Sequence, residues 1–418
     1  METITKAQAY EEVPGYDLTV NNVRIFDGLK ELSGLRSVGV RGRTITAISE
    51  TPLEGRETID GEGGWLMPGL IDTHVHLFSF STITDPETMD GYFREQIPPI
   101  LELFLQHGVT SIKSTGDPTS EIIELRDRLA VGSARGPRLL ATGSSVTGLD
   151  GHPVSTLFGG NVWYAARAVG QVHSIQMMRD FVHLLADRKV DAIKLSSEGA
   201  CCLPGSPKYI WQNAVFPNPV ELVRLPKRIL RAGIEAAHER GLRVTVHTVQ
   251  QVAAIEAIES GADGLEHGVA VEPITDKAVV EMIRERDISY TPTLWIYGQM
   301  HPSAIPNTRM VKDAGIRIAC GSDSFFGRGK YGENSLEEIE LLVTAGLTPV
   351  EALVAATSEA AIKLGRRDIG TLAEGKSADM ILLASNPLED ISNIRTLGMT
   401  ILNGEILVDK RQAAAARD

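Results

Sequence analysis

Short apolar runs alternate with amphipathic stretches through the middle of the chain. The eight runs are residues 69–73, 109–113, 138–141, 192–195, 243–246, 264–265, 289–291 and 317–319. Most of the stretches between them have apolar positions at the helical period, as in residues 226–238 and 252–259. Strands that alternate with crossover helices predict a parallel α/β fold, and eight strands are the number that closes a (β/α)₈ TIM barrel.

The two ends of the chain are richer in strand patterns than in helical ones. Residues 16–26 and 37–48 are β-rich, with glycine at turns, and residues 378–383 are a candidate strand. Asn403 and Gly404 are typical of a tight hairpin turn between two apolar segments. We therefore expect both ends to build one small β-sandwich domain beside the barrel. The predicted segments are residues 1–65 (sandwich), 66–367 (barrel) and 368–418 (sandwich).

Composition narrows the function classes. Of the 418 residues 43% are hydrophobic and 23% charged, which is ordinary for a globular protein. A formal charge of −13 disfavours binding to nucleic acid, whose phosphates are negative. No apolar run approaches the roughly 18 residues of a spanning helix, and the polar start resembles no signal peptide. We expect a cytoplasmic homo-oligomer that acts on a small-molecule substrate and binds neither membrane nor nucleic acid.

Candidate metal ligands lie where the apolar runs end. His74 and His76 close the first run, and on an extended backbone residues i and i+2 share a face, so both can bind one ion. Such a pair alone is a weak signal, because a buried core histidine is commoner. Barrel enzymes, however, place their catalytic groups at the carboxyl ends of the strands. Further candidates end or follow later runs: Lys194, His247, His267 and Asp323.

At this point the sequence resembles the metal-dependent amidohydrolase superfamily, in particular its imidazolonepropionase-like and prolidase-like (Xaa-Pro dipeptidase-type) branch. The resemblance rests on several motifs between about residues 16 and 408. They are Met67-Pro-Gly-Leu-Ile-Asp-Thr-His-Val-His76, Ile193-Lys194-Leu, Val246-His247, Glu266-His267-Gly, Gly321-Ser-Asp323 and the late segments 341–353 and 370–379.

The resemblance implies a binuclear centre with two divalent ions, most often zinc. His74, His76 and Asp323 would hold one ion, and His247 and His267 the other. Lys194 would bridge them as a carbamate, since an ammonium group cannot bind a cation. A lysine that merely reaches the surface is the alternative, which the apolar context Ala192-Ile-Lys-Leu195 disfavours.

The resemblance also implies a mechanism. A hydroxide that bridges the ions would attack a carbonyl polarised by one of them, and Asp323 would pass the proton to the leaving amine. The predicted reaction is cleavage of a C–N amide bond in a dipeptide or N-acyl amino acid. Alternatives are lactone, ester, carbamate or phosphotriester hydrolysis. A deaminase is disfavoured because Gln250 stands where those relatives carry a glutamate, and a non-catalytic barrel is the non-enzyme alternative.

Further residues are candidates for substrate contact. His152 is a candidate for binding the substrate carbonyl, against the alternative of a mere loop histidine. Tyr209 is a weaker candidate for the family tyrosine that steadies the oxyanion, and Tyr331 stands where the family has a histidine. Both departures put ordinary dipeptidase specificity in doubt. Residues near strand ends could meet a substrate carboxylate, although a solvated charge is the simpler interpretation for each: Lys113, Tyr297, His301, Arg328 and Lys330.

Two loops concentrate large apolar side chains, although aromatic residues make up only 5% of the chain. These side chains are Leu157, Phe158, Trp163 and Tyr164 in residues 148–164, and Tyr209, Trp211 and Phe216 in residues 199–219. Both loops follow strand ends and should overhang the metal site. They predict a pocket for a bulky apolar or aromatic substrate group. The alternative is a lid whose residues contact only one another.

Overall fold

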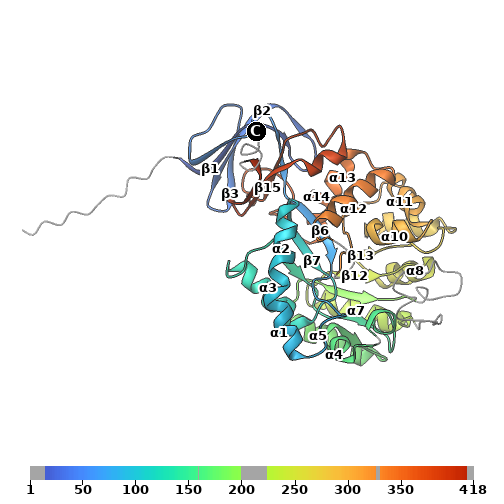
Figure 1. The fold of residues 1–418 in the computed structure, drawn as a ribbon. Helices are drawn as coiled ribbons and strands as arrows, with labels where there is room; N and C mark the ends of the chain where they lie inside the picture. Colours follow the sequence, from blue (N-terminus) through green and yellow to red (C-terminus); the bar gives the residue numbers. More distant parts are fainter. Residues whose placement is uncertain (1–14, 159, 199–223, 326–329, 412–418) are drawn as a thin grey trace, which may run out of the picture.

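The computed structural model describes residues 15–158, 160–198, 224–325 and 330–411 (Figure 1). One sheet lies at one end of the molecule, and strands and helices of the middle of the chain form the larger remainder. Within the described ranges no helix has the length and apolar character needed to cross a bilayer.

The sheet is built from both ends of the chain. Its eight strands are β1 (Tyr16–Phe26), β2 (Glu31–Arg41), β3 (Thr44–Ser49), β4 (Gly55–Asp60), β5 (Trp65–Pro68), β15 (Met380–Leu383), β16 (Leu397–Leu402) and β17 (Glu405–Asp409). They pair in the order β17-β16-β15-β5-β1-β2-β3, with β4 also on β1. The antiparallel pair β5–β15 joins the amino-terminal and carboxy-terminal strands. The turn expected at Asn403-Gly404 is confirmed, with φ angles of 53° and 79°.

The β-rich segment of residues 37–48 contains a turn, as its glycines predicted. Residues 37–48 do not form a single strand, because the chain turns back between Arg41 and Thr44. Gly42 has a φ of 54°, a conformation that glycine adopts without steric cost. The segment is therefore the second half of β2 followed by β3, which pair as a hairpin. The domain boundaries expected from the sequence stay a prediction.

The expected parallel α/β arrangement of the middle segment is confirmed. Its strands are β6 (Leu70–Val75), β7 (Val109–Ser114), β8 (Arg138–Ala141), β9 (Ser145–Thr147), β10 (Val169–Gln171), β11 (Ile193–Ser196), β12 (Val244–His247), β13 (Gly264–Glu266) and β14 (Ser289–Thr291). They form two parallel sheets, β6-β7-β8 and β10-β9-β11-β12-β13-β14. Seven of the eight predicted runs coincide with strands. The eighth, residues 317–319, makes only an isolated bridge through Ile318 to Tyr290.

Helices connect these strands and cover the sheets (Figure 1). They are α1 (Pro86–Glu95), α2 (Ile97–Gln106), α3 (Thr119–Ala130), α4 (Val162–Ala168), α5 (Ile175–Asp187), α7 (Lys227–Glu239), α8 (Gln251–Ser260), α9 (Ala278–Glu285), α10 (Leu294–Met300), α11 (Ala304–Asp313), α12 (Glu333–Thr344), α13 (Pro349–Ala355) and α14 (Ser358–Lys363), with a π-helical turn η1 (Val154–Phe158) and a 3₁₀ turn η2 (Ile391–Arg395). Ser174 caps α5 by accepting a hydrogen bond from the Met177 amide, and Gly261 ends α8 with a φ of 97°.

The end sheet leads directly into the strand that carries the first histidines. Strands β5 and β6 are separated by Gly69 alone, whose amide donates to the Asp379 carbonyl at 3.0 Å. A β-carbon at Gly69 would collide with the Thr110 side chain, so this close approach of β6 to β7 requires glycine. Both sheets therefore fix the backbone just before His74.

Candidate metal centre and its cavity

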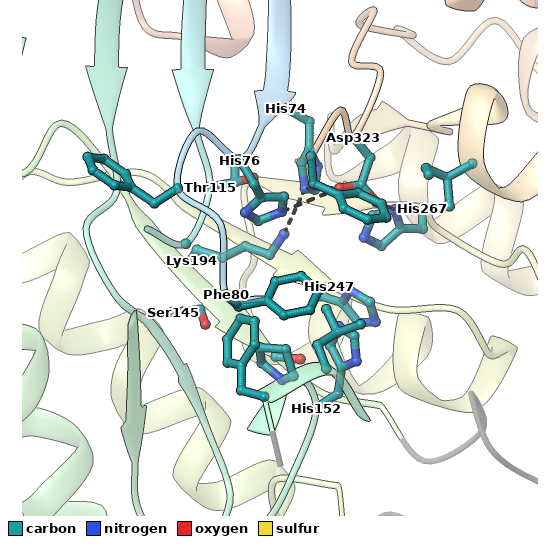
Figure 2. A pocket seen from close by; sticks show the side chains of 18 of the residues that line it. His74, His76, Phe80, Thr115, Ser145, His152, Lys194, His247, His267 and Asp323 are labelled. Carbon is teal, nitrogen blue, oxygen red and sulfur yellow. Dashed lines mark hydrogen bonds and ion pairs between the residues drawn. The ribbon is translucent and has the colours of Figure 1, made fainter. Parts of the chain in front are cut away.

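The six predicted ligands converge on one cavity (Figure 2). They are His74, His76, Lys194, His247, His267 and Asp323, and all of them line it. Strands β6, β11, β12 and β13 carry or immediately precede five of these residues, and parallel strands present their carboxyl ends on the same side. The cavity is open to solvent, and its empty volume, open mouth included, is about 880 Å³.

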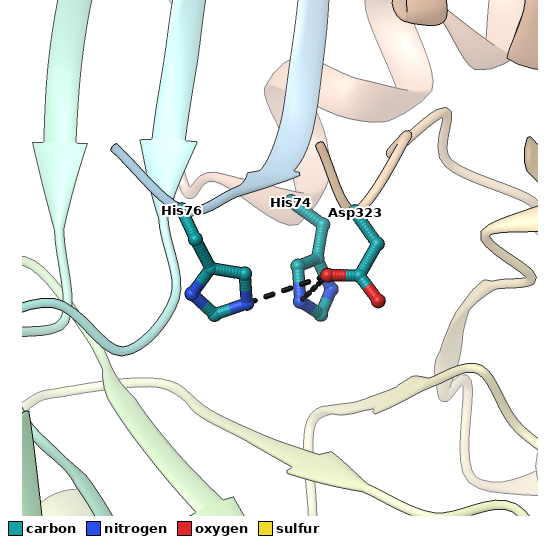
Figure 3. Close-up of side chains that lie close together, drawn as sticks. All are labelled: His74, His76 and Asp323. Carbon is teal, nitrogen blue, oxygen red and sulfur yellow. Dashed lines mark ion pairs between the residues drawn. The ribbon is translucent and has the colours of Figure 1, made fainter. Parts of the chain in front are cut away.

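His74, His76 and Asp323 form the first group of candidate ligands (Figure 3). Asp323 Oδ1 lies 3.5 Å from His74 Nε2 and 3.3 Å from His76 Nε2. Ligands bound at about 2.0–2.1 Å in a tetrahedral arrangement are about 3.3 Å apart. The spacing of the three atoms therefore fits ligands around one ion better than it fits direct hydrogen bonds.

Three of the histidines have one ring nitrogen in contact with a residue outside the set of six candidate ligands. His74 Nδ1 lies 2.9 Å from Glu266 Oε2, and His267 Nδ1 lies 2.7 Å from Thr293 Oγ1. His247 Nε2 lies 2.6 Å from a carboxylate oxygen of Glu198. A histidine held in this way has its other nitrogen free to bind an ion, and the partner orients the ring. These contacts fit divalent metal binding.

Burial keeps the candidate histidines neutral, which is the form that binds metal. It lowers the pKa of His74 to about 3 and the pKa of His247 to about 3. Burial also lowers the pKa of His267 well below its usual value. All three imidazoles can therefore offer a lone pair at neutral pH without losing a proton first.

Lys194 lies between the first group and His247 (Figure 2). It is 4% exposed, and its Nζ lies 3.5 Å from His74 Nε2. Burial lowers the pKa of Lys194 to about 8. A sizeable fraction of the amine is therefore unprotonated near neutral pH, as reaction with CO₂ requires. The alternative of a surface-reaching lysine does not fit this burial.

Asp323 is held in place by the backbone of β6. Its amide donates to the His74 carbonyl at 2.8 Å, and its own φ of 56° lies in the left-handed region. An aspartate adopts this region more readily than most residues, at a cost that the surrounding contacts must offset. Burial alone would raise the pKa of Asp323, but the neighbouring His74 and His76 outweigh burial and lower it. The carboxyl group is thus ionised.

Asp72 ties the first strand to the segment around Asp323. Its carboxylate accepts hydrogen bonds from the Ser322 amide at 3.0 Å, the Ser322 hydroxyl at 2.6 Å and the Ser335 hydroxyl at 2.7 Å. The His74 amide also donates to it, at 3.1 Å. Asp72 is fully buried, so these four donors satisfy a group that would otherwise be costly to bury.

Glu266 is the centre of a buried charge network that sequence analysis missed. Besides His74, its carboxylate contacts Lys113 Nζ at 3.3 Å, Lys363 Nζ at 2.9 Å and Thr245 Oγ1 at 2.5 Å. Burial opposes its ionisation, but Lys363 and Lys113 lower the pKa of Glu266 well below its usual value. The expected solvated role of Lys113 was wrong, because Lys113 lies within β7 and is 4% exposed. An available signal was the apolar context Ala361-Ile-Lys363-Leu.

A second group on the cavity wall consists of His152, Glu198 and His247. The rings of His152 and His247 stack, with centroids 4.2 Å apart and an interplanar angle of 25°. His152 Nδ1 lies 2.7 Å from Thr156 Oγ1 and 3.5 Å from Glu198 Oε2. Both histidines line the cavity. Glu198 was also missed, because it lies four residues after Lys194 and beyond the end of the apolar run.

Aromatic side chains form another part of the cavity wall, and Phe80 is one of them (Figure 2). Phe158 lies 5.1 Å from Phe80 and 5.1 Å from Tyr164, measured between ring centroids. The Tyr164 hydroxyl donates to the Phe78 carbonyl at 3.0 Å, which fixes the wall to the loop after His76. Leu157 also lines the cavity. The side chains thus contact one another, as in a lid, and also face the space in front of the candidate ligands.

The remaining predicted residues fall elsewhere. Tyr331 is buried, and its hydroxyl donates to the His76 carbonyl at 2.8 Å, so it supports His76 without lining the cavity. Tyr297 lines the cavity, whereas Lys330 pairs with Glu333 at the surface. Predictions on four residues fall outside the described part of the chain: Tyr209, Trp211, Phe216 and Arg328.

Comparison with known proteins identifies one matching family and several related enzymes. The Amidohydrolase family profile matches residues 65–407. The chain is 25% identical over 370 residues to the ochratoxinase of Aspergillus niger, covering 78% of this chain and 71% of that enzyme. It is 24% identical over 373 residues to the imidazolonepropionase of Anaeromyxobacter dehalogenans, covering 83% and 82%.

A solved structure shows the same fold. It is a Xaa-Pro dipeptidase with methionine bound in its active site, and it superposes with a TM-score of 0.78 at 23% sequence identity. The match covers 93% of this chain and 99% of that one.

Proposed function

We propose a specific reaction for this chain, which belongs to the amidohydrolase family and is accordingly a hydrolase acting on C–N bonds. The resemblance drawn from the sequence motifs is thereby confirmed. The proposed reaction is hydrolysis of the amide bond of a dipeptide or an N-acyl amino acid that carries a bulky apolar or aromatic group. The observation that carries it is the convergence of six ligand-type side chains on a cavity with an aromatic wall.

Two divalent ions, zinc in the first place, would be held by the chain's own residues. His74, His76 and Asp323 would hold one ion, His247 and His267 the second, and Lys194 both after its amine adds CO₂ and releases a proton. When bound, the ions supply Lewis-acid activation of water and of the scissile carbonyl. The support is the 3.3–3.5 Å spacing in the first group and the neutral, oriented imidazoles.

Two side chains would act on the substrate directly. Asp323 is ionised and lies at the centre of the ligand set, so it can take the proton of the attacking water and deliver it to the leaving amine. His152 faces the cavity with its Nδ1 held by Thr156, which suits contact with the substrate carbonyl. Without protonation the amine would leave as an unstable anion, which is why the reaction needs Asp323.

The aromatic wall supports the substrate class. Phe80, Phe158 and Tyr164 present an apolar surface in front of the ligands. The relatives' names include a dipeptidase and an imidazolonepropionase, so family membership leaves the substrate open. Among the described lining residues Lys194 is the one lysine or arginine. This favours, as a second candidate, an uncharged ester, lactone or carbamate of similar shape.

The proposed reaction can be tested by assaying the zinc- or manganese-reconstituted enzyme against a panel of substrates. The panel compares aromatic and alanyl amides, N-acyl amino acids, lactones, carbamates and aryl esters, with the bound metal counted in each preparation. We expect two ions per chain and the highest kcat/KM for an aromatic amide. In Phe158→Ala, KM should rise far more for aromatic than for alanyl amides, with metal content unchanged.

Trp163→Ala is the matched control for the aromatic wall. Trp163 lies in the same segment as Phe158 but packs under Arg167, with the guanidinium carbon 3.7 Å from its ring centroid, and does not line the cavity. Its removal should change KM equally, and little, for both amides. Equal effects of Phe158→Ala on both substrates would contradict the proposed role of the wall, and no C–N hydrolysis by metal-loaded enzyme would contradict the reaction.

We also propose that the two parallel sheets are arcs of one (β/α)₈ barrel over residues 66–367, beside a β-sandwich of residues 1–65 and 368–418. The support is backbone hydrogen bonding across the gaps. Thr73 N donates to the Cys320 carbonyl at 3.0 Å, and Asp191 N donates to the Ala141 carbonyl at 2.8 Å. A crystal structure in which the two sheets belong to separate domains would contradict this arrangement.

A further inference from the structure

Within the second group, Glu198 lies behind the two histidines and does not line the cavity. Its carboxylate is fully buried, and Glu198 is not among the residues that line the cavity, whereas His152 and His247 are. Its Oε2 atom lies 2.6 Å from His247 Nε2 and 3.5 Å from His152 Nδ1. A carboxyl group is therefore placed on the far side of a candidate metal ligand.

The distances from the Glu198 carboxylate to its neighbours indicate its role. Two oxygen and nitrogen ligands of one tetrahedral ion are about 3.3 Å apart, whereas a charge-assisted hydrogen bond is about 2.7–2.9 Å long or shorter. The 2.6 Å between Glu198 Oε2 and His247 Nε2 is a hydrogen-bond distance. The 3.3 and 3.5 Å from Asp323 to His76 and His74 are ligand spacings. Glu198 Oε2 also lies 3.5 Å from His152 Nδ1, so the short contact to His247 is what favours a hydrogen-bonding role over a ligand role.

A hydrogen bond in this place selects one form of the imidazole. If Nε2 of His247 carries the proton and donates it to Glu198, Nδ1 carries the lone pair. The stacked ring of His152, itself held by Thr156, limits rotation of the His247 ring about its axis. A carboxylate partner also makes the opposite nitrogen a stronger donor to a cation. Each of these effects favours ion binding by His247 Nδ1.

We propose that Glu198 is a positioning residue that orients and strengthens His247 as a ligand of the second ion. The inference rests on the proposed binuclear function and adds to it a residue outside the ligand set. It assigns the two glutamates parallel tasks, because Glu266 contacts the far nitrogen of His74 in the same way.

The test is the affinity of the second ion, measured without substrate. Zinc-loaded wild type, Glu198→Gln, Glu198→Ala and the control Ser197→Ala are titrated with a competing chelator while bound zinc is counted. We expect second-ion affinity to fall about 10–100-fold in Glu198→Ala and less in Glu198→Gln, whose amide oxygen still accepts the hydrogen bond. The first ion should bind equally in all four proteins. Ser197→Ala should match wild type, because Ser197 contacts His247 through backbone atoms.

The possible outcomes distinguish a failure of this inference from a failure of the proposed binuclear function. Two ions bound with equal affinity in wild type and Glu198→Ala would overturn the role of Glu198 alone. A crystal structure of the zinc-loaded enzyme with an ion within about 2.2 Å of a Glu198 oxygen would also overturn it, because Glu198 would then be a ligand. A wild type that binds one ion only would overturn the binuclear function and this inference together. Circular dichroism of Glu198→Gln, which keeps the side-chain size, checks that the variants are folded.

Discussion

The first and second groups are built from the same residue types, two histidines and one carboxylate, yet their atoms are spaced differently. In the first group Asp323 lies 3.3–3.5 Å from two imidazole nitrogens, and in the second Glu198 lies 2.6 Å from one. The first spacing leaves room for an ion between the atoms, and the second leaves room only for a proton. A cluster of ligand-type residues is therefore not enough to identify a metal site, and the distances between its atoms decide.

The buried glutamates behind the groups differ as well. Glu266, behind His74, contacts two lysines that come from β7 and α14, so its charge is balanced by cations. Glu198, behind His247, contacts two imidazoles that burial keeps neutral. One histidine is thus held by a charge network that also supports the fold, and the other by a contact close to the cavity.

Among variants that test the difference between the first and second groups, Asp323→Asn should have the largest effect. Removal of this carboxylate takes away a predicted ligand and the proton carrier, so kcat/KM should fall by at least about 1,000-fold. His152→Ala removes a proposed substrate contact and neither a proposed ligand nor the proposed proton carrier, and should cost less. Steady-state kinetics on one aromatic amide measures both. A larger loss in His152→Ala would reverse the assigned order of the two groups.

Lys194→Ala comes next in expected size. The variant should lose most activity, because the bridge between the two ions is gone. Short-chain carboxylic acids added with bicarbonate should restore part of it by supplying a surrogate carboxylate. Activity is assayed with and without the additives, and Lys194→Met with the same additives controls for space, since its side chain fills the gap. Full activity of Lys194→Ala without additives would mean that no carbamate bridge operates.

The difference between the glutamates should appear in stability. Glu266→Ala leaves Lys113 and Lys363 buried without their carboxylate, so we expect the free energy of unfolding to fall by about 3–5 kcal/mol. Glu198→Ala should cost less, since it removes contacts to the two imidazoles of His152 and His247, which burial keeps neutral. Chemical denaturation of the metal-free proteins measures both. Equal losses would show that Glu198 supports the fold as much as Glu266 does.

The last prediction concerns the pH dependence of stability and a third buried glutamate, Glu338 in α12, which accepts a hydrogen bond from the Trp295 amide at 2.6 Å. Burial raises the pKa of Glu338 to about 8 from a usual 4.5. Between these values the folded protein holds a proton that the unfolded chain has released, so stability falls as pH rises from about 4.5 to 8. Glu338→Gln should flatten this slope in melting temperatures measured from pH 5 to 8.5. Parallel slopes in both proteins would mean that Glu338 is already ionised in the folded state.

Local patterns predicted most of the strands and brought together all six ligands. The apolar runs before His74, Lys194, His247 and His267 are continuous in sequence, and parallel strands place their ends together whatever the loops do. The partners of these ligands could not be found in this way. Lys363 is 97 residues from Glu266, and only the folded chain brings their side chains together. Likewise, Glu198 lies in an irregular segment where no periodicity indicates which way a side chain points.

The contacts of the Asp72 carboxylate show that the first group can form only after a long part of the chain has been synthesised. The carboxylate joins β6 to Ser322, 250 residues later in the chain, and the first group needs Asp323 beside His74 and His76. A ribosome adding about 5–20 residues per second needs about 12–50 s to cover that interval. Throughout this time the nascent chain carries the two histidines without their carboxylate. The first group of candidate ligands is therefore completed only late in synthesis, after almost all the strands of the middle segment have emerged.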